Sequence, residues 1–256
     1  MPTPAPPPSR WRVLWFLPVG LLFTGAFAIV ASTLSIVTLG RFSTRLSPWL
    51  LRFWGRTILR IQGVTLDLQG AEHLTGRAMR VATFNHTSTM DAMIIPALTP
   101  QGGVSCLKRE ALYIPLVGLA VWSMGFLLID RGRSERARRL LQKAARRMAR
   151  DKLTVFIAPE GTRSPDGSLQ PFKRGAFHLA LESGAPVVPI VIDGAFELMP
   201  RQRHVARPGR LVVRVLPPIP TRDLTRETLD DFAAHLREVY QEALADLRAT
   251  GPRPGA

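Results

Sequence analysis

The stretch RVATFNHTSTMDAM, residues 80–93, joins a short apolar run to a polar segment and a second apolar run. Residues 80–84 have the composition of a buried β-strand, and residues 91–98 have that of a helix. His86 and Asp91 are five positions apart. Inside one ideal helix they would point about 140° away from each other. We therefore expect the two side chains to meet only if His86 lies in the loop before the helix.

The same residues also fit a helix cap without chemical function. Ser88-Thr-Met-Asp91 matches the S-x-x-[DE] capping box. In that interpretation Asp91 accepts hydrogen bonds from backbone N–H groups, and His86 is an ordinary loop residue. Because capping boxes are common at helix starts, the stretch alone favours the cap. The choice depends on the rest of the chain.

Short β-rich runs and helical runs alternate along the chain after residue 63. Seven strands are predicted, at VTLDLQ (64–69), RVATF (80–84), VSCL (104–107), FLLI (126–129), TVFI (154–157), PVVPIVI (186–192) and LVVRV (211–215). Helices are predicted at residues 91–98, 134–152, 174–183 and 226–248. This alternation indicates an α/β fold, which we expect to be a mixed sheet with helices on both faces.

The N-terminal part has a different composition. Residues 13–39 contain no charged residue, and the run is longer than the roughly 20 residues that a bilayer-spanning helix needs. Arg10 and Arg12 before Ala26-Phe-Ala28 also fit a cleaved signal peptide, but the apolar run continues well past that point. We therefore predict a membrane anchor, and leave open whether it crosses the bilayer or doubles back within it.

A basic amphipathic helix is predicted at residues 47–61. Arg52, Arg56 and Arg60 are four apart and so share one face, while apolar and aromatic residues cover most of the remainder. Such a helix suits the membrane interface, where its two Trp residues would lie at the headgroup level. The alternative is a surface helix packed on the main domain.

Length and charge limit the remaining possibilities. The 256 residues suffice for a membrane anchor at 1–62 and one α/β domain at 63–256. The 34 Lys and Arg against 19 Asp and Glu give a formal charge of +15, which fits nucleic acid, anionic lipid or a phosphorylated substrate. The positive excess after the apolar run favours a cytoplasmic main domain. The single cysteine, Cys106, excludes an intrachain disulfide and a Cys-based zinc cluster.

The segment APEGTRS, residues 158–164, follows a predicted strand directly. As a type I turn it needs no function. It also exposes backbone N–H groups beside the Thr162 hydroxyl and the Arg163 guanidinium, and such donors suit a phosphate. Arg131 and Lys108 follow other predicted strands and would add positive charge at the same edge of the sheet.

Four ordered blocks resemble the glycerolipid acyltransferases, in particular the 1-acylglycerol-3-phosphate acyltransferases. The blocks are NHTSTMD, which matches the H-x4-D motif of that family, GFLLIDR, APEGTRS and APVVPIVI. They span roughly residues 64–195. Between the first two blocks, LKREALYIPLVG is similar to a Lys-containing segment of the family. One such block would be weak, but four in the same order are specific.

The resemblance implies roles for particular residues. His86 would be the general base, and Asp91 would orient its ring and stabilise the imidazolium. The phosphate of the acceptor would be bound by residues of the second and third blocks, namely Arg131, Glu160, Gly161, Thr162 and Arg163. Lys108 is an additional candidate. No metal and no cofactor is expected, because the acyl donor, acyl-CoA or acyl-carrier protein, is itself a substrate.

The expected function is that of a membrane-bound enzyme of the inner membrane. It would transfer a fatty acyl chain to lysophosphatidic acid and yield phosphatidic acid. One alternative keeps this chemistry with another acceptor, such as a lyso-ornithine lipid or a lysophospholipid. A second is a non-catalytic basic protein that binds membranes or nucleic acid, which would leave the four blocks unexplained. A third makes His86 and Asp91 ligands of a metal hydrolase, but no second histidine lies nearby in the sequence.

Overall fold

The computed structural model describes residues 8–38, 47–114, 117–129 and 135–250. Within these residues one mixed sheet contains seven strands: β1 (Val64–Gln69), β2 (Arg80–Phe84), β3 (Gly103–Lys108), β4 (Leu127–Ile129), β5 (Thr154–Ile157), β6 (Val187–Asp193) and β7 (Gly209–Val215). The strand order across the sheet is β1-β7-β6-β2-β5-β3-β4. Each predicted strand is present, with ends that differ by at most a few residues.

The directions of the strands determine where the loops gather. β6 and β7 are antiparallel, whereas β2 is parallel to both β5 and β6, and β3 is parallel to β5. Thr83 pairs with Ile157 at the carboxyl ends of β2 and β5. The loops that follow these two strands therefore leave the sheet side by side.

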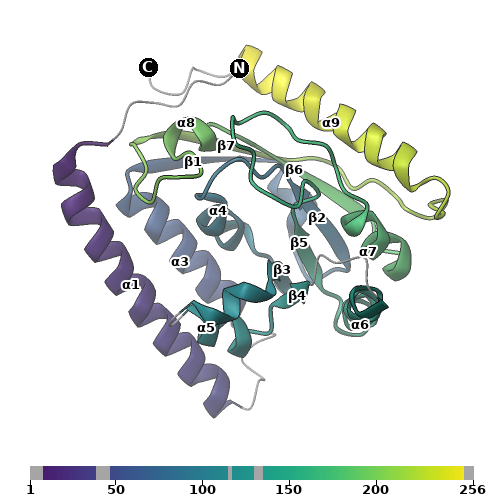
Figure 1. Cartoon of the computed structure of the whole chain (residues 1–256), viewed down its shortest axis with the longest axis horizontal. Coiled ribbons are helices and arrows are strands. Elements are labelled where there is room, and N and C mark those ends of the chain that lie inside the picture. Colours follow the sequence, from purple (N-terminus) through teal and green to yellow (C-terminus); the bar gives the residue numbers. More distant parts are fainter. Residues whose placement is uncertain (1–7, 39–46, 115–116, 130–134, 251–256) are drawn as a thin grey trace.

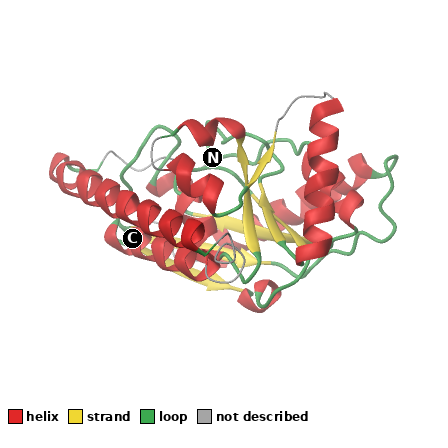
Figure 2. Ribbon diagram, turned by 90° about the horizontal axis from the view of Figure 1, so that it is seen from below, coloured by secondary structure: helices red, strands yellow, loops and turns green. Residues whose placement is uncertain are grey.

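Helices cover both faces of the sheet, as predicted (Figures 1 and 2). The helical elements are α1 (Arg10–Val37), α3 (Ser47–Ile61), η1 (Ala71–Leu74), α4 (Asp91–Leu98), η2 (Arg109–Tyr113), α5 (Val117–Ser123), α6 (Glu135–Asp151), α7 (Gly175–Ser183), α8 (Ala195–Leu198) and α9 (Leu229–Thr250). One apolar cluster joins one face of the sheet to α6, α7 and α9. Another joins the opposite face to α3, α4 and α8.

Alternate strand residues enter the two clusters. In β2, Val81 belongs to the cluster with α9, while Ala82 belongs to the cluster with α4. In β5, Val155 belongs to the cluster with α9 and Phe156 to the cluster with α4. Burial on both faces explains why these strands are continuous apolar runs without an alternation of polar residues.

Tyr240 ties α9 to the middle of the sheet. Its ring is fully buried, and its hydroxyl donates to Thr83 Oγ1 at 3.0 Å and accepts from the Ile190 N–H at 3.2 Å. Burial raises the pKa of Tyr240, so the hydroxyl stays protonated and able to donate. The last helix is thereby bonded to both β2 and β6.

The apolar segment at the N-terminus forms α1, a single helix that continues through Pro18. It does not double back within residues 10–37. It is long and apolar enough to cross a membrane, and little of its apolar surface is covered by the rest of the protein. Phe23 and Phe27 contact the aromatic rings of α3, at Phe53 and Trp54.

α3 has the bounds predicted for the basic amphipathic helix, and it packs on the main domain as the second interpretation expects. One face packs closely on α4, because a Cβ at Gly55 would lie 2.6 Å from both the Met93 carbonyl oxygen and the Ala97 nitrogen. The side chains of Trp49 and Phe53 remain exposed. α3 therefore packs as part of the α/β core. Its contact with a membrane and the domain boundary at residue 62 stay predictions.

Candidate active site

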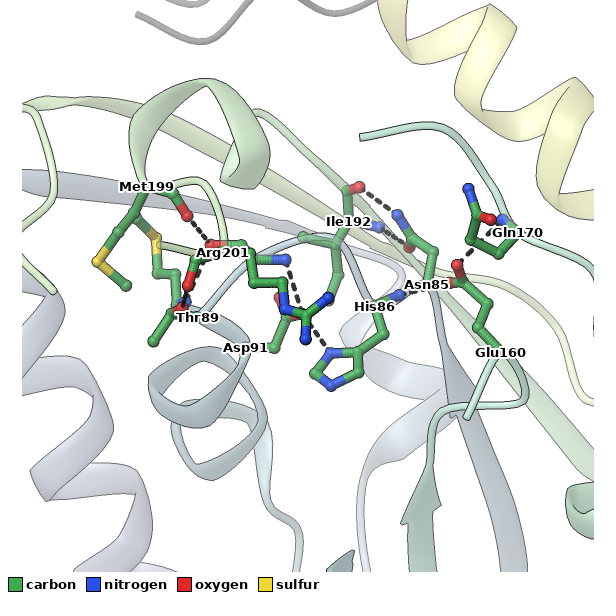
Figure 3. A network of polar contacts seen from close by, with 11 residues as sticks. Asn85, His86, Thr89, Asp91, Glu160, Gln170, Ile192, Met199 and Arg201 are labelled. Carbon is green, nitrogen blue, oxygen red and sulfur yellow. Dashed lines mark hydrogen bonds and ion pairs between the residues drawn. The ribbon is translucent and has the colours of Figure 1, made fainter. Parts of the chain in front are cut away.

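His86 lies in the loop between β2 and α4, and Asp91 is the first residue of α4. The two side chains meet, with His86 Nδ1 2.6 Å from Asp91 Oδ2 (Figure 3). The expectation that they would meet from a loop and a helix start is confirmed. The Asp91 side chain is 2 % exposed and that of His86 19 %, so the carboxylate is enclosed while the imidazole reaches the surface.

The capping contacts are present as well. Asp91 Oδ2 also accepts the Ser88 N–H at 3.2 Å, and Ser88 Oγ accepts the Met90 N–H at 2.9 Å. The other Asp91 oxygen, Oδ1, is buried without a hydrogen-bond partner among the described residues. One carboxylate oxygen thus holds both the loop and the imidazole, so the two interpretations of this stretch are compatible.

Asn85 holds the start of the His86 loop against β6 through two hydrogen bonds. Its Oδ1 accepts the Ile192 N–H and its Nδ2 donates to the Ile192 carbonyl, both at 2.8 Å (Figure 3). Sequence analysis assigned no role to Asn85. The sequence feature that could have indicated this role is the position of Asn85 directly after a buried strand. There an amide side chain can make the two hydrogen bonds that the backbone of a further strand residue would make.

The other end of the loop is fastened to the segment after α8. Ser88 Oγ donates to the Met199 carbonyl, and Thr89 Oγ1 donates to the Arg201 carbonyl at 2.8 Å (Figure 3). The sequence did not predict these two hydrogen bonds, because the bonded residues are more than 100 positions apart. The His86 loop is consequently held from β6, from α4 and from the residues after α8.

Glu160 is almost completely buried, at 1 % exposure. Its Oε1 accepts the His86 N–H at 2.6 Å and its Oε2 accepts the Gln170 N–H at 3.0 Å. Burial raises the pKa of Glu160 to about 7, although these two N–H groups lower it. Sequence analysis grouped Glu160 with the phosphate ligands, whereas the structure places its carboxylate on backbone donors of the His86 loop.

The segment 158–163 forms the predicted turn. The Gly161 N–H donates to the Ala158 carbonyl at 3.1 Å, and Gly161 has φ of +72°, which favours glycine. The Thr162 side chain is exposed and that of Arg163 is half-buried. Arg163 Nε is buried and has no hydrogen-bond partner among the described residues. It is therefore a donor that an anionic ligand would satisfy.

Two predicted site residues have no described side-chain position. β3 ends at Lys108, at the same edge of the sheet as His86, and Arg131 lies outside the described residues. Within the described parts of the chain, no three His, Cys, Asp or Glu side chains lie close enough to hold a metal ion. The site that the structure brings together consists of His86, Asp91 and the 158–163 segment.

Comparison with known proteins relates this site to a family. Residues 65–193 match the acyltransferase family. The chain is 34 % identical to a 1-acyl-sn-glycerol-3-phosphate acyltransferase of Limnanthes alba, over 84 % of this chain and 78 % of the relative. It is also 34 % identical to the alpha 1-acyl-sn-glycerol-3-phosphate acyltransferase of Homo sapiens, over 79 % and 73 % of the two chains.

The fold has a solved counterpart. The crystal structure of the 1-acyl-sn-glycerophosphate acyltransferase of Thermotoga maritima superimposes with a TM-score of 0.69 and 24 % identity, covering 93 % of this chain and 100 % of that chain. At this identity the likeness concerns the fold. It extends beyond the α/β sheet, since the matched part is larger than residues 65–193.

Proposed function

The chain belongs to the acyltransferase family, and from this premise we propose that it transfers a fatty acyl chain to the sn-2 hydroxyl of 1-acylglycerol-3-phosphate. The donor is a thioester, either acyl-CoA or acyl-carrier protein, and the product is phosphatidic acid. The observation that carries this proposal is the hydrogen bond between His86 Nδ1 and Asp91 Oδ2. The names of the relatives supply the acceptor.

The His86 ring is arranged for general-base catalysis. Its Nδ1 bonds to Asp91, and in Figure 3 the other ring nitrogen points away from that carboxylate. Nε2 takes the proton of the acceptor hydroxyl while the oxygen attacks the thioester carbonyl. When the C–S bond breaks, the imidazolium returns this proton to the sulfur. A new ester C–O bond replaces the C–S bond, and neither a serine nor a cysteine nucleophile is required.

Asp91 stabilises the imidazolium that forms during the reaction. Its carboxylate fixes the tautomer with the proton on Nδ1, so that Nε2 is free to accept a proton. Glu160 acts on the same residue indirectly, because it holds the His86 N–H and thereby the position of the loop. We assign Glu160 a positioning role and not direct contact with the phosphate.

The acceptor phosphate is bound by the 158–163 segment. Arg163 supplies the unpaired Nε, and Thr162 and the Gly161 turn add hydroxyl and backbone donors. A phosphate monoester carries nearly two charges and three strong acceptor oxygens, which suits several donors at one site. Lys108, the last residue of β3, contributes further positive charge, and Arg131, two positions after Ile129 in the sequence, is a further candidate.

The enzyme acts at a membrane. α1 anchors the chain, since its apolar side chains are exposed along most of its length. We place the α/β part on the cytoplasmic side of the inner membrane, because most of the positive charge follows the apolar helix. Both substrates are then accessible: the lysolipid from the bilayer and the thioester donor from the cytoplasm.

A mass-spectrometric acyl-transfer assay tests this proposal. The full chain is offered lysophosphatidic acid, lysophosphatidylcholine and lyso-ornithine lipid, each with acyl-CoA and with acyl-carrier protein. We expect phosphatidic acid to form fastest. Equal rates on lysophosphatidic acid and on the two zwitterionic acceptors would contradict a site for a phosphate monoester, and a faster reaction of lyso-ornithine lipid would favour that alternative acceptor.

A further inference from the structure

The exposed apolar side chains of the protein are confined to one region. Among the described residues, every exposed large hydrophobic side chain belongs to α1, to α3 or to the stretch 113–122. The third group lies inside the α/β part of the chain, between β3 and β4: Tyr113, Ile114, Leu119 and Trp122. Tyr113 is 77 % exposed and Trp122 is 67 % exposed. Apolar surface gathered on one region in this way marks an interaction site.

This group continues the surface of α1. In Figure 1, α5 lies beside α1 and in front of α3. Ser35 Oγ of α1 donates to the Ser123 carbonyl at 2.5 Å, and Ser123 Oγ donates to Ser32 Oγ at 3.3 Å. Ala28 and Ala31 of α1 are buried in the same contact. The small residues let α5 approach α1 closely, and the two helices share one apolar surface.

The opposite side of α5 is left open by this packing. Ala120 and Met124 face a small cluster that contains Leu51 of α3. Leu119 and Trp122 are exposed. The shape of the segment is constrained, because a Cβ at Gly118 would collide with the Leu112 carbonyl. The backbones of Leu112 and Gly118 are therefore in close contact, next to the exposed Tyr113 and Leu119.

We propose that residues 109–114 and 117–123 form a second membrane-binding element, which inserts into the interfacial layer of the same lipid bilayer that holds α1. A helix of seven residues is too short to span the hydrocarbon core, so it lies at the surface. Trp and Tyr are the residues that favour the headgroup level. This inference rests on the proposed membrane position of α1.

The position of this element affects the reaction. The chain enters it from Lys108 and leaves it toward β4, after which Arg131 follows in the sequence. The element therefore begins directly after Lys108, the last residue of β3, which is assigned to the acceptor phosphate. Insertion at the headgroup level brings that site to the depth where the phosphate of a bilayer lysolipid lies. The acceptor then reaches His86 without leaving the membrane.

Single-cysteine labelling of the full chain tests the inference. In a Cys106→Ser background, an environment-sensitive fluorophore is attached at Leu14→Cys of α1, at Leu119→Cys of α5 or at Ala245→Cys, an exposed position of α9. Each protein is placed in vesicles of phosphatidylethanolamine and phosphatidylglycerol. Quenching by nitroxide lipids and by aqueous iodide is then measured.

We expect the labels at 14 and 119 to be quenched by nitroxide lipids and shielded from iodide, and the label at 245 to behave in the opposite way. Iodide quenching at 119 equal to that at 245, with lipid quenching at 14, would overturn this inference alone. Iodide quenching at both 14 and 119 would overturn the proposed membrane anchor as well. Shielding at 119 that needs no lipid and increases with protein concentration would assign the surface to a second copy and overturn the inference.

A charge-insertion variant gives an independent measurement. Leu119→Glu with Trp122→Glu should weaken partitioning of the full chain into the same vesicles by about tenfold. The matched control, Ala245→Glu with Ala249→Glu, adds the same charge to α9 and should partition like the wild type. Equal partitioning of the two variants, with unchanged circular dichroism, would overturn the inference.

Discussion

His86 and Asp91 are the residues whose replacement tests the chemistry most directly. We expect His86→Ala to lower kcat by about 10²- to 10⁴-fold, because the hydroxyl loses its general base. Asp91→Asn should lower kcat less, since the base remains but is poorly oriented. Steady-state acyl transfer measures both effects.

His235→Ala is the control for these variants, because this exposed histidine lies on α9 and should leave kcat unchanged. A folded His86→Ala protein with normal turnover would refute the mechanism. If Asp91→Asn lowers only the melting temperature, its contact with the Ser88 N–H is the one that matters.

Arg163 is the residue that tests the proposed phosphate site. We expect Arg163→Ala to raise KM for lysophosphatidic acid by about tenfold or more, because a charged hydrogen bond contributes about 1.5–3 kcal/mol. The rate on the zwitterionic acceptors, lysophosphatidylcholine and lyso-ornithine lipid, should change little. Arg222→Ala, at an exposed position after β7, is the control. An equal loss on all acceptors would show that Arg163 supports the fold and not phosphate binding.

The buried Glu160 makes stability depend on pH. Its pKa is raised from 4.5 to about 7, chiefly by burial, so the folded state holds this proton more tightly than the unfolded state does. Its contribution to the free energy of unfolding is therefore fully present below pH 4.5 and is lost as the pH rises through 7. The full change is on the order of 3 kcal/mol.

Urea unfolding in detergent at pH 5 and pH 8 measures this dependence. Glu160→Gln removes the titration and should flatten the profile relative to the wild type. Both oxygens of Glu160 accept a backbone N–H, whereas Gln has only one side-chain oxygen and places its NH2 group against the other N–H. The variant should therefore also be less stable at pH 5. Glu238→Gln, exposed on α9, should reproduce the wild-type profile. Parallel profiles for Glu160→Gln and the wild type would exclude Glu160 as the titrating group.

At the scale of the elements, the contact between α3 and α4 depends on one glycine. We expect Gly55→Ala to destabilise the protein by about 1–3 kcal/mol, because the new methyl group forces two backbones apart. The same shift moves α4, which carries Asp91, so kcat should fall too. Thermal unfolding and acyl transfer are the measurements.

Gly20→Ala is a matched control in another helix, since a Cβ at Gly20 meets nothing within 4 Å. Alanine favours helix over glycine, so this variant should be neutral or slightly more stable. A Gly55→Ala protein as stable as Gly20→Ala would mean that α3 and α4 separate without cost.

The long elements were predictable because their patterns are local. The predicted ends of β1, β2, β5, α3 and α4 are those observed. α9 begins at Leu229 and not at residue 226, because Thr225 and Thr228 bond to each other's backbone N–H groups before the helix. η2, α5 and α8 were missed. Their few residues do not complete a helical period, and packing against distant segments forms them.

The site was predictable to a lesser extent. His86 and the 158–163 segment lie at one edge of the sheet, as their positions directly after predicted strands indicated. The bonds of Asn85 to Ile192 and of Glu160 to two backbone N–H groups were not foreseen. Both depend on a register between strands that no local pattern specifies.

At the scale of the whole molecule, the N-terminal segment contains two parts with different roles. Leu59 of α3 belongs to the core between α4 and the sheet, and only 1 % of it is exposed. We expect a chain that lacks residues 1–46 to fold in detergent and to bind membranes much more weakly than the full chain. Removal of residues 1–62 should abolish cooperative unfolding, because α4 then loses its neighbour. Melting curves that coincide for the two truncations would contradict this.

Synthesis on the ribosome leaves β1 without its neighbour for most of the translation time. β1 is the first strand to be made, and its partner in the sheet is β7, the last. Pairing between such distant segments is slow, because a long loop must close first. Until residue 209 has emerged, the nascent chain presents an open strand edge. A ribosome that stalls earlier therefore releases a fragment with a template for aggregation.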